Sequence, residues 1–307
     1  MTRLVRLTIA AAALVGAPMR PAAQELEPGL YQNAPINFNL AAASMLVSRG
    51  NVLFDSALPI EDATADVQAF ILTYVRTLSV VDRAAKLDVQ VPMTWAHFTG
   101  LVSGDVRTRS PTGLADPRFR LAVNIVGSPA LSLPEFARYR QRTIVGVALQ
   151  VAMPLGQYDP DRLINIGANR WSFRPELGVS RALGRLTLEL AAGAWLFTAN
   201  DDFFGGRELT QRPLYFAKGA AIWSFRGGRW LAFNYGRATG GQTRIDGGPS
   251  APLQENDRVA ATLLLPMRRT QALRLTYTSG LFTRLGADFE TVAVGYQFSW
   301  TKLPARP

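Results

Sequence analysis

Apolar and polar residues alternate along this chain with a period of two, most regularly between Asp288 and Trp300. One face of that segment is apolar and aromatic, and carries Val292, Val294, Tyr296, Phe298 and Trp300. The other face is small or polar, and carries Thr291, Ala293, Gly295, Gln297 and Ser299. Successive side chains of a β-strand point to opposite faces, so this pattern predicts a strand.

The same alternation recurs in further segments, and we interpret twelve of them as strands. They are residues 35–47, 66–80, 84–98, 115–127, 142–155, 171–183, 185–198, 212–225, 229–239, 257–267, 271–284 and 288–300. These lengths suit the ~9–11 residues of a tilted membrane-spanning strand with some extension. An even number of strands is typical of single-chain bacterial barrels. The sequence therefore predicts an all-β fold, an antiparallel transmembrane β-barrel of 12 strands.

The connections between these strands alternate in length. Short ones are expected at residues 81–83, 184, 227–228 and 268–270, and long ones at 48–65, 99–113, 156–170, 200–211 and 240–256. Barrels of this class have short periplasmic turns and long outer loops. Gly227 and Gly228 predict a two-residue hairpin, because glycine tolerates positive φ. Two connections break the alternation: residues 128–141 are long and predict a short helix, and residues 284–287 are short.

The first residues have the pattern of a secretory leader. Arg3 and Arg6 precede an apolar run over residues 7–17, which Pro18 ends. The run is shorter than the roughly 20 residues of a membrane-spanning helix, and a buried N-terminal helix is the alternative. We expect cleavage after Ala23 or Gln24, which divides the chain into a signal peptide (1–23) and an outer-membrane barrel (24–307).

The amino-acid composition argues against several kinds of site and partner. The chain has no cysteine, which excludes disulfides and thiolate metal sites. The formal net charge of +10 includes Arg3, Arg6 and Arg20 of the leader. The remaining arginines are spread through alternating segments without a basic helix, so we expect no nucleic-acid partner. No cofactor and no metal site are expected.

The six tryptophans test the predicted topology. If the first strand runs outward, three lie near outer strand ends, namely Trp95, Trp171 and Trp195. The other three lie near inner ends, namely Trp223, Trp230 and Trp300. Tryptophan prefers membrane–water boundaries, so we interpret these residues as two aromatic girdles. Trp195 falls in the inward register of its strand, which leaves a lumen role open.

Charged residues in the strands are expected to face the lumen, because a lysine or arginine at a lipid-facing midplane costs about 2–4 kcal/mol. The candidate lumen path is Lys86, Arg118, Arg120, Arg174, Glu176, Glu189, Arg258 and Arg274, with Asp88, Lys218, Asn124 and Asn234 in the same register. Cations outnumber acids in this set. Either the charges pair and fill a closed lumen, or they form a positive wall that favours anionic solutes.

A hydrolytic function has little support in the sequence. His97 is the single histidine, and the residue two positions along its strand is Thr99 rather than a serine. We interpret His97 as an interfacial residue and predict no catalytic residues. The loop aromatics Phe54, Tyr158, Phe203 and Phe204 could form an outer apolar funnel or could pack the loops together.

Several blocks of the chain resemble one known family. Residues 155–180 (LGQYDPDRLINIGANRWSFRPELGVS) resemble the most recognisable block of the family described as "Putative MetA-pathway of phenol degradation". Residues 27–39, 58–78 and 113–136 are similar to other blocks of it. The resemblance implies an outer-membrane β-barrel that transports hydrophobic or aromatic compounds, and it transfers no site residues. One departure is the tail, since seven residues follow Trp300.

These observations favour a passive channel for small aromatic or hydrophobic compounds, with an arginine-lined lumen. The alternative is a closed structural or surface-interaction barrel whose outer loops carry the function. For either, the expected location is the Gram-negative outer membrane. The expected partners are outer-membrane lipid, lipopolysaccharide, the barrel-assembly machinery and a small-molecule solute. A neutral apolar solute would favour lateral passage through the wall.

Overall fold

The computed structural model describes residues 26–53, 60–102 and 104–301. The predicted leader, its cleavage site, Phe54 and the tail beyond Thr301 lie outside these residues.

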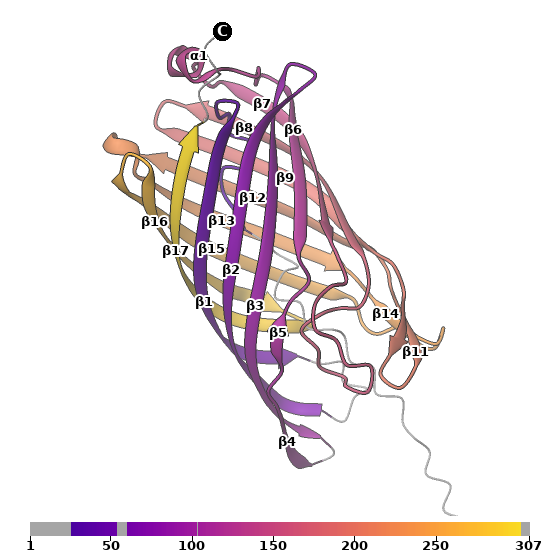
Figure 1. The fold of residues 1–307 in the computed structure, drawn as a ribbon. Helices are drawn as coiled ribbons and strands as arrows, with labels where there is room; N and C mark the ends of the chain where they lie inside the picture. The colour runs from indigo at the N-terminus through magenta and orange to yellow at the C-terminus, as the bar shows by residue number, and fades with distance from the viewer. Residues whose placement is uncertain (1–25, 54–59, 103, 302–307) are drawn as a thin grey trace, which may run out of the picture.

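Long antiparallel strands close into a barrel (Figure 1). The described residues form twelve wall strands: β1 (Phe38–Leu53), β2 (Ile60–Val80), β3 (Arg83–Val102), β6 (Arg118–Val126), β7 (Thr143–Ala152), β8 (Ser172–Leu183), β9 (Leu186–Phe197), β12 (Leu214–Ser224), β13 (Trp230–Gly240), β15 (Gln254–Arg268), β16 (Gln271–Thr283) and β17 (Gly286–Thr301). The last strand pairs with the first, from Phe38 opposite Thr301 to Leu53 opposite Gly286. The 12-stranded antiparallel barrel predicted from the alternation is confirmed.

Alternation along each strand separates the lumen from the outer surface. On β8, for example, Arg174 and Glu176 are buried in the interior, whereas Pro175 and Leu177 are exposed outside. The outer surface therefore carries an apolar band, and closure pairs the backbone groups of the wall strands. These are the two conditions for crossing a membrane with strands.

The end of the barrel with short turns carries a short helix, α1 (Leu133–Arg138), within the connection where a helix was predicted (Figure 1). Glu135 accepts a hydrogen bond of 2.8 Å from the Ser132 backbone N–H, which is the reciprocal half of a capping box. No helix among the described residues is long and apolar enough to cross a membrane. Barrels of this class have short turns at the periplasmic end and long loops at the outer end, so the end that carries α1 is the periplasmic end.

The turn between β12 and β13 is longer than predicted. Gly227 and Gly228 do adopt positive φ, of 77° and 76°. However, the ladder stops at the pair Ser224 and Trp230, and a short 3-10 helix, η1 (Arg226–Gly228), fills the connection. The two-residue hairpin was therefore wrong, because the strands separate before the glycines.

The opposite, outer end contains short strands that the sequence analysis did not predict. Two of them, β4 (Asp105–Arg109) and β5 (Thr112–Leu114), fold back onto β3. Three more form a separate sheet, namely β10 (Asn200–Phe203), β11 (Arg207–Gln211) and β14 (Thr243–Ile245). They belong to the loops β9–β12 and β13–β15.

Residues 26–37, which we call the luminal segment, lie inside the barrel and lead into β1. The predicted first strand began at residue 35, but Asn37 has a φ of 60° and β1 begins at Phe38. Asn37 donates its backbone N–H to the Thr77 carbonyl at 3.1 Å, and Ile36 donates to the Leu131 carbonyl at 2.8 Å. The segment thus enters the lumen from the periplasmic end.

The occupied lumen as candidate functional site

Charged side chains from opposite walls meet in the lumen around the luminal segment. Most of the predicted lumen path lies here, on β3, β6, β8, β9, β12 and β16. The residues are Lys86, Asp88, Arg120, Arg174, Glu176, Glu189, Lys218 and Arg274. Arg258 is also interior, but it donates to the Ala287 carbonyl at 2.6 Å, away from this cluster. Arg118 is partly buried on β6, two residues further toward the outer end than Arg120.

Arg120 pairs with two carboxylates. Its Nε lies 2.6 Å from Asp88 Oδ2 on the neighbouring strand β3, and its Nη2 lies 2.7 Å from Glu27 Oε2 of the luminal segment. Arg274 reaches the same carboxylate from β16, with Nη1 3.6 Å from Glu27 Oε1. Four wall strands separate β6 from β16 on one side and six on the other. Glu27 therefore links opposite walls.

A second group centres on Glu176. Its Oε2 lies 2.9 Å from Lys218 Nζ and 3.7 Å from Arg174 Nη2, and its Oε1 accepts a 2.8 Å hydrogen bond from the Tyr31 hydroxyl. Arg174 also lies 5.2 Å from the centre of the Trp195 ring, within the range of a cation–π contact. The luminal segment therefore contributes one polar side chain to each charged group.

The backbone of the luminal segment is held as well. Gly29 N–H donates to Glu189 Oε2 at 2.7 Å, and Lys86 Nζ donates to the carbonyls of Gly29 and Leu30 at 3.0 and 2.9 Å. Asn124 donates to the Tyr31 carbonyl at 3.2 Å. These polar groups would otherwise be buried without partners, so the wall and the segment satisfy each other.

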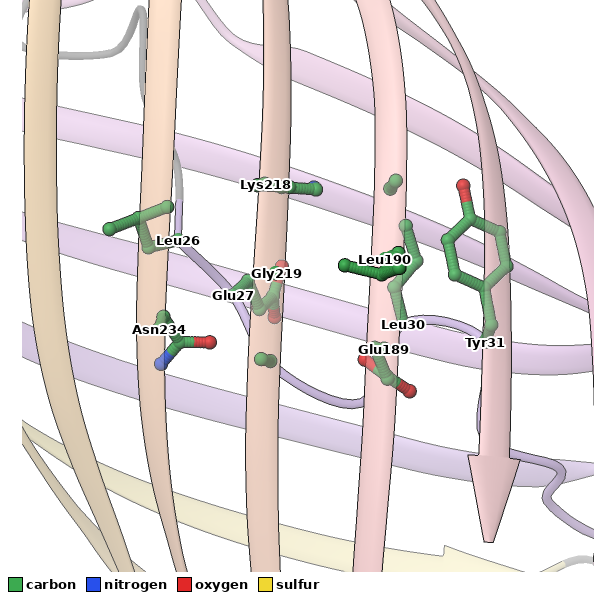
Figure 2. A pocket seen from close by; sticks show the side chains of 11 residues that line it. Leu26, Glu27, Leu30, Tyr31, Glu189, Leu190, Lys218, Gly219 and Asn234 are labelled. Carbon is green, nitrogen blue, oxygen red and sulfur yellow. The ribbon is translucent and has the colours of Figure 1, made fainter.

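Beside Glu27 lies a small cavity (Figure 2). Its wall side comes from β9, β12 and β13, and its segment side includes Leu26, Glu27 and Tyr31. Its free volume of about 20 Å³ holds one water molecule. With the segment in place, this part of the lumen has no room for an organic solute.

The charges of the lumen are more balanced than the strands alone indicate. Glu27 comes from outside the alternating segments and was not among the predicted site residues. Burial raises the pKa of its carboxyl, and Arg120 and Arg274 lower it by more, so that the pKa lies well below its usual range. Glu27 therefore stays ionised and offsets part of the cation excess. The sequence signal for it was the acidic pair Glu25 and Glu27 upstream of the first strand.

The β7–β8 loop (residues 153–171) crosses the outer mouth. Ile164 packs against an apolar cluster on the inner faces of β1, β2, β3 and β17, which includes Val67 and Phe289. The adjacent Leu163 packs on the opposite side, against Phe203 of the loop sheet β10–β11–β14. The loop therefore joins both sides of the mouth, and it coincides with the block on which the family resemblance rests.

Two polar side chains stabilise that loop. Asp116 accepts hydrogen bonds from the backbone N–H groups of Gly156 and Ala168, at 3.1 and 3.0 Å, and so joins its two arms. Arg109 donates to the Ile164 carbonyl at 2.6 Å. Of the loop aromatics, Phe203 is buried in the cluster and Phe204 packs against it. They pack the loops together and do not form an open funnel.

One of the predicted girdle tryptophans faces the lumen and not the membrane. Trp195 is 3% exposed and packs inside the barrel with Leu214, Phe216 and Ala238. Its girdle assignment is therefore corrected: position 195 is in the inward register of β9, as the alternation indicated. The other five lie on the outward faces or at strand ends, namely Trp95, Trp171, Trp223, Trp230 and Trp300.

His97 has a hydroxyl neighbour that the sequence did not indicate. Its Nδ1 lies 2.7 Å from Ser110 Oγ, and its Nε2 lies 3.4 Å from Thr99 Oγ1, all at the exposed outer end of β3. Among the described residues, no carboxylate hydrogen bonds to this ring. The arrangement thus lacks the group that orients a catalytic histidine.

Known structures share this fold. The COG4313 outer membrane channel from Pseudomonas putida F1 matches with a TM-score of 0.73 and 20% identity, over 90% of this chain and 100% of that one. The β domain of the Bordetella autotransporter BrkA matches at 0.51 and 12%, over 85% and 99%. The transport unit of AIDA-I from Escherichia coli matches at 0.51 and 8%, over 89% and 92%.

The fold is therefore that of Gram-negative outer-membrane β-barrels, and the COG4313 channel is one protein that shares it. No curated protein matches the sequence. The sequence profile described as "Putative MetA-pathway of phenol degradation" matches residues 51–264, which include the β7–β8 loop and most of the wall. The chain belongs to this family of outer-membrane barrels.

Proposed function

We propose that this barrel is a channel of the Gram-negative outer membrane that passes small aromatic or hydrophobic compounds by passive diffusion through an arginine-lined lumen. The observation that carries the proposal is the meeting of Arg120 and Arg274, from opposite walls, at one carboxylate in mid-lumen. Two guanidinium groups at this position favour anionic solutes.

The chemistry of arginine suits aromatic acids. A guanidinium binds a carboxylate through charge-assisted hydrogen bonds and can also stack on a flat ring. Arg174 already shows the second contact, at 5.2 Å from the Trp195 ring. Many products of aromatic degradation carry a carboxylate on such a ring, which agrees with the family to which the chain belongs.

The environment follows from the same proposal. Residues 1–23 would be removed as a signal peptide on export, and the barrel would be inserted by the assembly machinery. The apolar band then contacts lipid, and the outer loops contact lipopolysaccharide. A solute enters from the outer mouth and leaves past the luminal segment.

Single-channel conductance and ion selectivity in planar bilayers test the proposal. The refolded mature chain should conduct with a preference for anions, and Arg120→Ala and Arg274→Ala should each reduce that preference. Arg49→Ala is the matched control, because Arg49 is exposed and pairs with Asp66 outside the lumen. A folded barrel that neither conducts nor passes benzoate into liposomes would overturn the channel.

A closed structural or surface-interaction barrel is the second candidate. Two observations favour it: the luminal segment fills mid-lumen, and the β7–β8 loop crosses the outer mouth. Under this function the protein would show no solute flux in either assay. Its outer loops would instead bind lipopolysaccharide, and Ile164→Ala would weaken that binding.

A further inference from the structure

We propose that Glu27 occupies a binding site for solute carboxylates, and that an aromatic carboxylate enters the lumen by replacing the Glu27 carboxylate between Arg120 and Arg274. This inference rests on the proposed channel function and names its ligand class and its binding site. The Glu27 side chain would then be an internal competitor, attached to the same chain.

The wall provides the cations of this site, but the luminal segment provides the anion. Arg120 comes from β6 and Arg274 from β16, whereas Glu27 lies upstream of the first strand. The wall part of the cluster has five cations and three acids, namely Lys86, Arg120, Arg174, Lys218 and Arg274 against Asp88, Glu176 and Glu189. Moving Glu27 away leaves that excess facing the lumen, where it attracts a replacement anion.

A further polar side chain lines the same cavity. Asn234 is 95% buried and lines the cavity beside Glu27, and its Nδ2 has no hydrogen-bond partner among the described residues. Figure 2 shows Asn234 on β13 next to Leu26, with Lys218 on the neighbouring strand. A buried amide N–H without a partner is costly, and a solute oxygen would satisfy it. Arginine and amide donors together match a carboxylate.

The cavity is too small for a solute to bind beside the Glu27 side chain, so the solute has to replace that side chain. The cavity beside Glu27 holds about one water molecule, with about 20 Å³. A ring with a carboxylate therefore fits only when the Glu27 side chain leaves. The Arg120 guanidinium is buried, but the Glu27 side chain is 32% exposed, so it is the more accessible partner of the pair.

The luminal segment is built so that its tip can move while its base stays. Gly29 has a φ of 86°, a conformation that favours glycine, and a Cβ there would meet only the Gln32 side chain at 3.7 Å. Beyond this position Tyr31 is fixed by its bond to Glu176 and by full burial. We therefore place the movement in residues 26–28, with Gly29 as the hinge.

The test measures benzoate binding to the folded mature protein in detergent, by isothermal titration calorimetry. Glu27→Gln keeps the shape of the side chain but removes its charge. It should bind benzoate about tenfold more tightly or more than the wild type, since a competitor that is ~90% bound reduces apparent affinity about tenfold. Adding Arg274→Gln should abolish this gain. Glu208→Gln, on the exposed outer strand β11, is the matched control and should bind like wild type.

Benzyl alcohol distinguishes a carboxylate site from a simple gain of space. Its affinity should be unchanged by Glu27→Gln, and an equal gain for both compounds would overturn the inference. So would benzoate affinity that is the same in Glu27→Gln, Glu27→Ala and wild type. As a measurement that needs no variant, saturating benzoate should speed hydrogen exchange of residues 26–29 in the wild type, and unchanged exchange contradicts the inference.

These outcomes separate the inference from the channel function. Anion conductance without tighter benzoate binding in Glu27→Gln would leave the channel in place and remove the carboxylate site at Glu27. Tighter binding in a barrel that does not conduct would support the site and overturn the channel.

Discussion

The ring of Tyr31 lies so close to Gly178 that a Cβ at position 178 would come within 2.0 Å of ring atom Cε2. Gly146 is the cross-strand partner of Gly178 on β7, and a Cβ there would lie 2.5 Å from the same ring. The paired glycines form a slot in the barrel wall that accommodates the Tyr31 ring. Any side chain at either position would fill the slot. The wall is thus shaped around the luminal segment.

Gly178→Ala should therefore release the luminal segment. Overpacking a filled site costs about 1–3 kcal/mol, which corresponds to roughly a 5- to 150-fold shift of the equilibrium away from the seated segment. Hydrogen exchange of the peptide containing Tyr31 should accelerate by about that factor, measured by mass spectrometry. Gly219→Ala is the control, because its nearest neighbour is the flexible tip of Leu190 at 3.2 Å. Wild-type exchange in Gly178→Ala would refute the slot.

Tyr31→Phe tests the hydroxyl separately from the ring. The ring keeps its slot, but the 2.8 Å hydrogen bond to Glu176 is lost. A hydrogen bond to a charged group contributes about 1.5–3 kcal/mol, so exchange of residues 29–31 should accelerate by about tenfold or more. Tyr158→Phe removes a hydroxyl that donates to the Asp202 carbonyl in the outer loops, and it should leave the luminal segment unchanged. Equal exchange in both variants would contradict a role for Glu176.

The wall could be predicted from the sequence because alternation is a local signal. Leu177 and Leu190 alternate with Glu176 and Glu189, and burial of the charged residues follows from the cost of placing them in lipid. Even Trp195 was indicated by its register, although its residue type favoured the girdle. Local chemistry and period two therefore account for the strands and for which side chains face the lumen.

The contents of the lumen could not be predicted in the same way. Glu27 and Tyr31 lie in a stretch without periodicity, and their positions depend on Arg274 and Glu176, far away in the sequence. The loop sheet of β10, β11 and β14 could not be predicted either, because it joins strands from two different loops. Contacts of this kind are set by the closed barrel, and no pattern within one segment encodes them.

The pH dependence of the luminal segment follows from Glu27. Its carboxyl pKa is depressed below the ordinary 4.5, since Arg120, Arg274 and Lys218 outweigh the effect of burial. A depressed pKa contributes stability that is present above the ordinary value and is lost as pH falls through the lower, folded value. Exchange of residues 26 and 27, corrected for its intrinsic pH dependence, should therefore be constant between about pH 7 and pH 5 and should accelerate as the pH falls below the ordinary 4.5. Gly29 is left out of this measurement because its N–H is bonded to Glu189.

Glu27→Gln should raise that exchange over the whole range, because the ion pairs are absent at every pH. Wild-type exchange that stays constant as the pH falls from about 5 to about 3 would mean that Glu27 has the same pKa in the seated and the released segment, so that the arginines do not hold it.

Asp116 should determine how firmly the β7–β8 loop closes over the mouth. Its carboxylate joins Gly156 and Ala168, and each hydrogen bond to a charged group contributes about 1.5–3 kcal/mol. In Asp116→Ala, trypsin should cleave after the exposed Arg162 about tenfold faster or more, because cleavage follows the population of the opened loop. Asp201→Ala, an exposed change on β10 of the neighbouring loop, should leave the rate unchanged. If Asp116→Ala is also cleaved at the wild-type rate, the packing of Leu163 and Ile164 against opposite sides of the mouth is sufficient to hold the loop.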